Sequence, residues 1–434
     1  MNVILDLDDL FQACHNGNEE LVRSLVQNIS MNDLNHADPK NDGNTCLHVA
    51  AANGHDDIVK ILLEHGSYRS LNLNHQQKSA YSIAAQTKES TRLLFLRSIP
   101  TNSLTKCSSR FYEQNANDCF DFVRYEDETN VDEKDFLKEK YSNIQTYRTE
   151  EEKQHQIEYS ASSKAMCQSR IGRFFVNLFH DDEPLDEKSI LDRLSNIFKS
   201  ISGDDSGDNR KLNDLFDQYL KNGHCIEQLI HLYTLETDFY RTLKKNCLPL
   251  ALPLFVHLPE LKERHFKGRS FRGMLMTHDQ FIVYRIAAER PGTILQTRSF
   301  SSTSIDRNVA EQFASLKSEK KENKFPVLFV FDFPETCDQA INLSRISNNQ
   351  PCLSEYEDEQ EVLVLPWTLF QVTRIQNPKP DDDLPIVHLT NVVIPKKTLF
   401  STFKWSWVEL KNQVKKEKKL VFDCAFQKYN TLNN

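Results

Sequence analysis

The chain has 434 residues, which is enough for two or three domains that each bury a hydrophobic core. Hydrophobic residues make up 39% and charged residues 26%, so most of the chain is expected to be globular, and a net charge of -9 argues against a nucleic-acid-binding protein, which would carry a basic surplus. The ten cysteines are scattered without a CxxC pair, so we expect neither a metal site nor a disulfide framework.

The N-terminal stretch MNVILDLDDL carries acids where a signal peptide would carry positive charge. No apolar run approaches the length needed to cross a bilayer, and the longest candidate, LPLALPLFVHLP at 248–259, is interrupted by prolines. We therefore expect a soluble cytoplasmic protein with no membrane contact.

Residues 1–100 contain an internal repeat. The stretch GNTCLHVAAANGHDDIVKILLEHG at 43–66 resembles an ankyrin repeat through a T-x-L-H-x-A-A pattern formed by Thr45, Leu47, His48, Ala50 and Ala51. Weaker copies lie upstream at 10–26 and downstream at 79–96. Because such a helix pair is stable only when a neighbour covers its apolar face, about three repeats are expected, and the resemblance implies a protein partner. His48 is expected to be a hydrogen-bonded core residue and not a ligand.

Residues 101–185 are polar and acidic and are expected to form a helical or partly disordered connector, with RIGRFFVNLF at 170–179 as an amphipathic piece inside it. Apolar residues at helical spacing then predict helices on both sides of a loop at SGDDSGDN, 202–209, and a further continuous helix at 229–246.

After about residue 268 the pattern changes to short β-like runs with one interposed helix near 308–317. Seven runs are expected to be strands: SFRGMLM, FIVYRIA, TILQTRSFSSTS, FPVLFVFDF, EVLVLP, LFQVTRI and IVHLTNVVI. They predict an α+β domain dominated by strands. The tail at 396–434 contains a basic amphipathic segment, 404–426, which is expected to pack as a helix on this domain.

Polar residues interrupt three of these runs. Arg272 stands inside an apolar run and needs an anionic partner or a wet cleft, because an unpaired buried guanidinium is costly. Ser302 and Ser304 share one face of an extended chain, and Glu359 and Glu361 are spaced in the same way before the run Val362–Leu365. An arginine, a hydroxyl pair and two carboxylates could therefore converge.

The order Arg-Gly at 272–273, F-x-S-T-S at 300–304 and E-x-E-V-L at 359–363 resembles the R-S-E class of mono-ADP-ribosyltransferases. The likeness covers roughly residues 186–395. It implies a catalytic domain with a helical N-terminal part, followed by two packed, mainly antiparallel β-sheets around an NAD cleft. The whole chain is then multidomain, with an all-α ankyrin region ahead of this α+β domain.

The resemblance also implies roles for single residues. Arg272 would bind the pyrophosphate of NAD, a co-substrate, with the bidentate fork that suits arginine better than lysine. Glu361 would stabilise the cationic ribose of the transition state, supported by Ser302. Gly273 would offer backbone groups to the carboxamide, and Phe313 would stack on nicotinamide, although a core role for Phe313 is an equal or better alternative.

Glu359 would engage the acceptor, and a glutamate at this position goes with arginine as the modified side chain. The implied activity is transfer of ADP-ribose to arginine in a protein substrate that the ankyrin repeats help to select. Two alternatives stay open: an NAD glycohydrolase that uses the same residues, and a catalytically inert ankyrin scaffold. The other acids of the loop, Glu355, Glu357 and Asp358, are expected to be a solvated flank.

Overall fold

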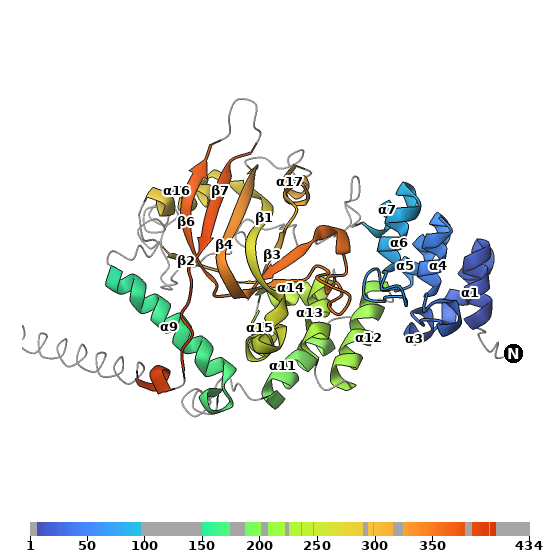
Figure 1. Cartoon of the computed structure of the whole chain (residues 1–434), viewed down its shortest axis with the longest axis horizontal. Helices are drawn as coiled ribbons and strands as arrows, with labels where there is room; N and C mark the ends of the chain where they lie inside the picture. The colour runs from blue at the N-terminus through green and yellow to red at the C-terminus, as the bar shows by residue number, and fades with distance from the viewer. Residues whose placement is uncertain are drawn as a thin grey trace, which may run out of the picture.

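The computed structural model describes residues 7–96, 150–173, 187–200, 207–221, 225–235, 237–245, 247–289, 294–297, 299–315, 324–377, 384–398 and 400–404. Figure 1 shows an array of short helices at the N-terminal end, a second group of helices beside it, and a twisted sheet beyond them. The described chain is thus a helical region followed by an α+β region, as expected.

The N-terminal array consists of paired antiparallel helices. Its elements are α1 (Leu7–Asn16), α2 (Glu19–Leu25), η1 (Val26–Asn28), α3 (Met31–Leu34), η2 (Pro39–Asn41), α4 (Cys46–Ala52), α5 (Asp56–Glu64), α6 (Ala80–Thr87) and α7 (Glu89–Phe95). Their inward faces form one continuous hydrophobic cluster, which extends from Leu10 to Phe95. Stacking of successive pairs therefore builds the core, as the repeat pattern predicts.

The T-x-L-H pattern has a local structural reason. The Thr45 hydroxyl caps the start of α4 by accepting from the backbone N–H of His48, while the ring of His48 reaches back to Thr45 in a capping box. The other ring nitrogen of His48 lies 3.0 Å from the carbonyl oxygen of Lys78 in the next repeat. Burial lowers the pKa of His48 to about 4. The expectation of a hydrogen-bonded core histidine is confirmed.

The second helical group precedes the sheet. It comprises α11 (Glu187–Ser200), α12 (Gly207–Lys221), α13 (Ile226–Thr234), α14 (Asp238–Lys245), α15 (Leu248–His257) and η4 (Leu258–Arg264). The single helix expected at 229–246 is in fact two, α13 and α14, which pack on different parts of one core. The proline-interrupted apolar run forms α15, a buried helix with Pro253 inside it.

Within the described residues, seven strands form one hydrogen-bonded sheet in the order β1-β3-β5-β4-β7-β6-β2. They are β1 (His265–Thr277), β2 (Ile294–Gln296), β3 (Ser301–Ser304), β4 (Lys324–Asn342), β5 (Glu361–Val364), β6 (Leu369–Gln376) and β7 (Ile386–Asn391). All pairs are antiparallel except β4 with β7. The α+β class and the mainly antiparallel pairing are confirmed, but the strands are joined into one sheet where two packed sheets were expected.

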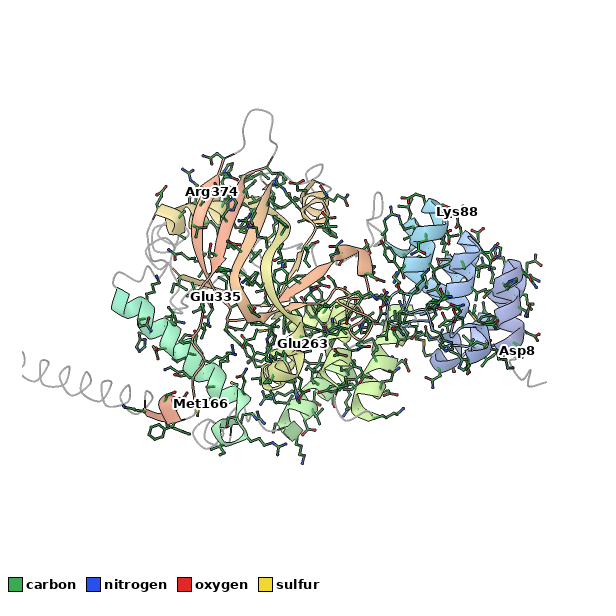
Figure 2. All side chains as sticks on the ribbon, in the orientation of Figure 1. Asp8, Lys88, Met166, Glu263, Glu335 and Arg374 are labelled. Carbon is green, nitrogen blue, oxygen red and sulfur yellow. The ribbon has the colours of Figure 1, made fainter. Side chains whose placement is uncertain are left out.

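The long strand β4 explains why the sheet is continuous. Its first part pairs with β1 and β7, and its last residues, Ala340 to Asn342, pair with β5. Because β3 pairs with both β1 and β5, the four strands β1, β3, β5 and β4 close on themselves. In Figure 2 the labelled Glu335 lies on the part of β4 nearer the helices, and Arg374 on β6 lies toward the opposite end of the sheet.

The run FIVYRIA, expected to be a strand, is part of helix α16 (His278–Glu289). The Thr277 hydroxyl accepts from the backbone N–H of Gln280, and the side chain of Gln280 accepts from the backbone N–H of Thr277. This T-x-x-Q capping box was present in the sequence and outweighs the β-propensity of the run that follows it. The other expected helix, near 308–317, is present as α17 (Arg307–Ser315).

Helix α9 (Glu150–Gln168) belongs to the expected connector. The rest of that connector up to residue 149, most of the segment 170–179, and the basic tail at 404–426 except Lys404 lie outside the described residues. Among the described helices, none is long and apolar enough to span a bilayer.

Candidate functional site

The polar residues singled out from the sequence lie on three neighbouring strands. Arg272 is on β1, Ser302 is on β3, and Glu361 is the first residue of β5. The register pairs Phe271 with Ser304, and Ser304 with Glu361. Segments that are far apart along the chain are therefore adjacent in the sheet, with β3 between the other two.

Strand alternation decides which way these side chains project. Ser302 and Glu361 leave one face of the sheet, on which Leu363 packs against the helical group. Arg272 follows Phe271 and therefore leaves the opposite face at its Cβ. Its guanidinium nevertheless reaches β3, where Nη1 lies 3.4 Å from the carbonyl oxygen of Ser302. The structure thus joins Ser302 and Glu361 on one face and brings Arg272 to β3 from the other.

Glu361 is held by a serine in the loop before it. The hydroxyl of Ser354 donates to Oε2 of Glu361 over 2.8 Å. On the same face, the hydroxyl oxygen of Tyr233 on α13 lies 3.4 Å from that of Ser302. The carboxylate and the serine are consequently enclosed by hydroxyl groups from the preceding loop and from the helical group.

The spacing indicated that Glu359 shares an extended strand with Glu361, but the structure places Glu359 before the strand. It ends a short turn, η5 (Glu357–Glu359), and Gln360 then adopts a left-handed conformation with φ 44 before β5 begins. The turn is pinned because the Ser304 hydroxyl donates to the carbonyl oxygen of Glu359 over 2.7 Å. The relative position of the two carboxylates therefore depends on this turn of the backbone and not on strand alternation.

Gly273 lies under helix α17. A Cβ added there would meet the carbonyl oxygen of Ala310 at 1.9 Å and the Cβ of Ala314 at 2.9 Å. Close packing of a helix on a strand therefore requires glycine at this position. Phe313 belongs to the same helix and is buried.

All four central side chains are almost inaccessible to solvent. The exposed fraction is 3% for Arg272, 1% for Ser302, 2% for Glu359 and 0% for Glu361. In this conformation Glu361 is enclosed by the loop and the side chains around it. Among the described residues, no group of three or more His, Cys, Asp or Glu side chains is arranged to hold a metal ion.

The acidic loop is not a solvated flank, contrary to expectation. Glu355 is 1% exposed and forms an ion pair with Lys211, which is fully buried, over 2.7 Å. Arg69 and His231 contact the same carboxylate at 3.3 and 3.2 Å. Burial by itself raises the pKa of Glu355, but the charge of Lys211, the hydrogen bond from His231 and the charge of Arg69 outweigh it and lower the pKa well below its usual range.

Glu357 is also engaged, because the Ser79 hydroxyl at the start of α6 donates to its carboxylate. Asp358 is only partly exposed. The loop that precedes β5 is thus bound through two of its acids to the ankyrin array, which is the N-terminal array of helices from α1 to α7. A run of acids in sequence gives no signal for this arrangement, since the cations that neutralise Glu355 come from distant segments.

Sequence reasoning missed Ser354, Arg69 and Lys211. Lys211 lies on an amphipathic helix where a lysine is ordinarily solvated, and Arg69 follows the second helix of the complete repeat. The only available signal was for Ser354, a polar residue close to E-x-E, and nothing in the sequence indicated its partner.

Comparison with protein families matches a model of ankyrin repeats (3 copies) to residues 10–103. Comparison with curated proteins gives no match.

Comparison with solved structures finds ADP-ribosyltransferases and a bacterial effector. ADP-ribosyltransferase HopU1 of Pseudomonas syringae pv. Tomato DC3000 is 14% identical, and the match covers 42% of this chain and 87% of that one with a TM-score of 0.30. Vis toxin, an ADP-ribosyltransferase from Vibrio Splendidus, is 15% identical, and the match covers 48% of this chain and 87% of the toxin with a TM-score of 0.23. The type III effector XopAI from Xanthomonas axonopodis pv. citri is 17% identical, and the match covers 60% of this chain and 97% of the effector chain with a TM-score of 0.26. Similarity at this level does not carry function.

Proposed function

We propose that the chain is an NAD-dependent mono-ADP-ribosyltransferase that transfers ADP-ribose to arginine side chains of proteins and releases nicotinamide. The observation that supports this most is the adjacency of β1, β3 and β5, which carry Arg272, Ser302 and Glu361 in the order of the R-S-E pattern. The donor set also fits the chemistry, since it combines a permanent cation, hydroxyl groups and carboxylates.

Each residue has a defined task in this proposal. NAD supplies a leaving group that departs as neutral nicotinamide, so the protein needs no general acid for departure. Glu361 stabilises the positive charge that develops on the ribose, and Ser302 supports it from the same face. Arg272 binds the pyrophosphate, for which a guanidinium is the suitable donor. Gly273 and Phe313 remain the positions proposed for the nicotinamide.

Glu359 is proposed to engage the guanidinium of the acceptor. Its turn lies beside the ankyrin array, because Ser79 contacts Glu357 two residues earlier. A protein held by the ankyrin repeats would therefore present its arginine near this turn. The expected partners are a protein substrate and a protein ligand of the repeats, with no nucleic acid, metal or membrane involved.

The test incubates the pure full-length protein with NAD labelled in the adenylate part and with an arginine-rich acceptor protein, alongside Glu361→Gln. The proposal expects label on arginine in the wild type and loss of both labelling and nicotinamide release in the variant, because charge stabilises the sugar cation and shape alone does not. Equal nicotinamide release by the variant and the wild type would contradict the role of Glu361. No release by the wild type would leave the inert scaffold as the function.

NAD glycohydrolysis is a second candidate, favoured by one observation. Glu359 is only 2% exposed, so a bulky acceptor reaches it less easily than water does. Free ADP-ribose without any labelled arginine would identify this activity, which uses the same Arg272, Ser302 and Glu361.

A further inference from the structure

The ankyrin array touches the loop that holds Glu361. The hydroxyl of Ser70, which follows the second repeat, donates to the carbonyl oxygen of Ser354. The hydroxyl of the same serine, Ser354, donates to Glu361. Two hydrogen bonds that meet at one residue therefore connect the ankyrin array to the carboxylate, and Ser70, Ser354 and Glu361 are all fully buried.

Glu355, the residue after Ser354, holds the loop in place through ion pairs. Glu355 lies between Lys211 and His231, which belong to the helical group, and Arg69, which belongs to the ankyrin segment. The backbone N–H of Glu355 donates to the hydroxyl of Thr234 over 3.0 Å, so the backbone is fixed as well as the side chain. A buried carboxylate surrounded by cations is costly to displace, because it would leave charges without partners.

Further contacts from the ankyrin array lie on the same loop or next to it. The guanidinium carbon of Arg69 lies 5.1 Å from the centre of the Tyr356 ring. Ser79 donates to Glu357, and Arg345, between β4 and the loop, donates to the carbonyl oxygen of Gln77. From Ser354 to Glu357, every residue of the loop has a partner in the ankyrin array.

We propose that Ser354 is a positioning residue for Glu361, and that the ankyrin array controls it by holding the loop 354–357 through Ser70 and Arg69. This inference rests on the proposed function of Glu361. It assigns to the ankyrin array a role in the catalytic step itself, in addition to binding a partner. A ligand that shifts residues 69–70, between the second and third repeats, would then change the orientation of the carboxylate.

The experiment measures kcat and KM for NAD cleavage in full-length Ser354→Ala, Ser70→Ala and Arg69→Met. Ser354→Ala keeps the carbonyl oxygen that Ser70 binds and removes the hydroxyl, which donates to Glu361 and also accepts from the backbone N–H of Tyr356. We expect its kcat to fall about tenfold with KM for NAD within about twofold, since one hydrogen bond to a charged group is lost. Ser70→Ala and Arg69→Met are expected to lower kcat by about threefold to tenfold in the same pattern.

Matched controls come from the ankyrin array itself. Arg23→Met breaks an ion pair with Glu19 inside α2, and Ser90→Ala removes a hydrogen bond to Asp56, so each control repeats the chemical change away from the loop. Figure 2 labels Asp8 at the end of the array that is remote from the sheet, and α2 follows the helix that begins there. Both controls are expected to keep wild-type kcat and KM.

Amide hydrogen exchange of the segment 353–364 gives a readout that does not depend on activity. Faster exchange there in Ser70→Ala and Arg69→Met, with wild-type exchange in both controls, is expected if the ankyrin array holds the loop.

The outcomes separate the two proposals. An active wild type whose kcat is unchanged in Ser354→Ala and in Arg69→Met would overturn the positioning proposal and leave the proposed function intact. A change in KM alone would also overturn it, because the hydroxyl would then act on binding. A wild type without NAD cleavage would overturn the proposed function and the catalytic part of this inference, and the exchange data would then decide whether the array holds the loop. Unchanged exchange in both interface variants would overturn that holding role.

Discussion

Glu359 and Glu361 are two residues apart, yet different forces fix them. Glu361 begins a strand and accepts a hydrogen bond from Ser354, whereas Glu359 ends a turn whose backbone is bound by Ser304. The left-handed Gln360 between them separates their environments. Substitution of one carboxylate should therefore leave the other in place.

This separation leads to a prediction for Glu359→Ala. We expect transfer to arginine to fall about a hundredfold while NAD hydrolysis stays within about threefold, because Glu359 acts on the acceptor and Glu361 still stabilises the ribose. The measurement compares labelled arginine with free ADP-ribose in one reaction. Glu289→Gln, on the exposed end of α16, is the control and should change neither activity. Equal loss of both activities in Glu359→Ala would exclude a role confined to the acceptor.

The pKa of Glu355 predicts a pH-dependent stability. Because the pKa is lowered in the folded protein, the ion pairs stabilise the fold above the unfolded-state value and are lost as the pH falls through the lower folded-state value. Glu355→Gln should cost about 3 to 5 kcal/mol at pH 7, since it leaves Lys211 buried without its main partner. At pH 4 the difference in the free energy of unfolding between the variant and the wild type should be smaller by roughly 1 kcal/mol.

Urea unfolding of both proteins at pH 7 and pH 4 measures this difference. Glu19→Gln, which breaks an exposed pair with Arg23, should cost less than about 1 kcal/mol at either pH. A cost for Glu355→Gln that is equally small, or that grows on acidification, would be inconsistent with a buried charged carboxylate.

At the scale of elements, the contact between α17 and β1 depends on the absence of a side chain at Gly273. A methyl group there would meet the backbone oxygen of Ala310 at 1.9 Å, and a backbone atom cannot rotate away. We predict that Gly273→Ala lowers the free energy of unfolding by about 2 to 4 kcal/mol. Thermal unfolding measures the loss. Met274→Leu, a buried change of similar volume at the next position, should cost less than about 1.5 kcal/mol.

Elements also show why the run FIVYRIA was assigned wrongly. Its aromatic and β-branched residues favour a strand, but the capping box at Thr277 and Gln280 fixes a helix start directly before it. By contrast, the ankyrin helices and α17 were predicted correctly, because their apolar spacing, caps and breakers all agree. Where local signals agree the sequence was sufficient, and where they compete, as at Thr277 and Gln280, the capping box outweighed the β-propensity of the run.

At the scale of the whole molecule, helix α12 of the second helical group packs against the ankyrin array (Figure 1). The guanidinium of Arg210 donates to the carbonyl oxygens of Ile29 and His65, and the Tyr68 hydroxyl donates to Asp214 over 2.8 Å. A Cβ on Gly207 would lie 2.5 Å from the carbonyl oxygen of Glu64.

We predict that the wild type unfolds in one main calorimetric transition and that Gly207→Val splits it into two. The valine side chain would collide with backbone at the end of α5 and separate two modules that otherwise stabilise each other. Asp217→Asn on the same helix, whose side chain is exposed and pairs with Lys221, should keep the single transition. Two transitions in the wild type would show that the junction does not couple the modules.

The sequence by itself determined the ankyrin repeats, the α+β character of the second half and the candidate residues Arg272, Ser302, Glu359 and Glu361. The repeats and the α+β character follow from periodicity and caps, which are local properties of the chain, whereas the roles of the candidate residues follow from the resemblance in motif order. Only the tertiary structure decided that the acids before β5 are buried, that Arg272 and Glu361 leave opposite faces of the sheet, and that Ser70, Arg69 and Lys211 hold the loop at Ser354 and Glu355. The physical reason is that a charge or hydroxyl is buried only when a partner from another segment meets it, and such a pairing leaves no local pattern.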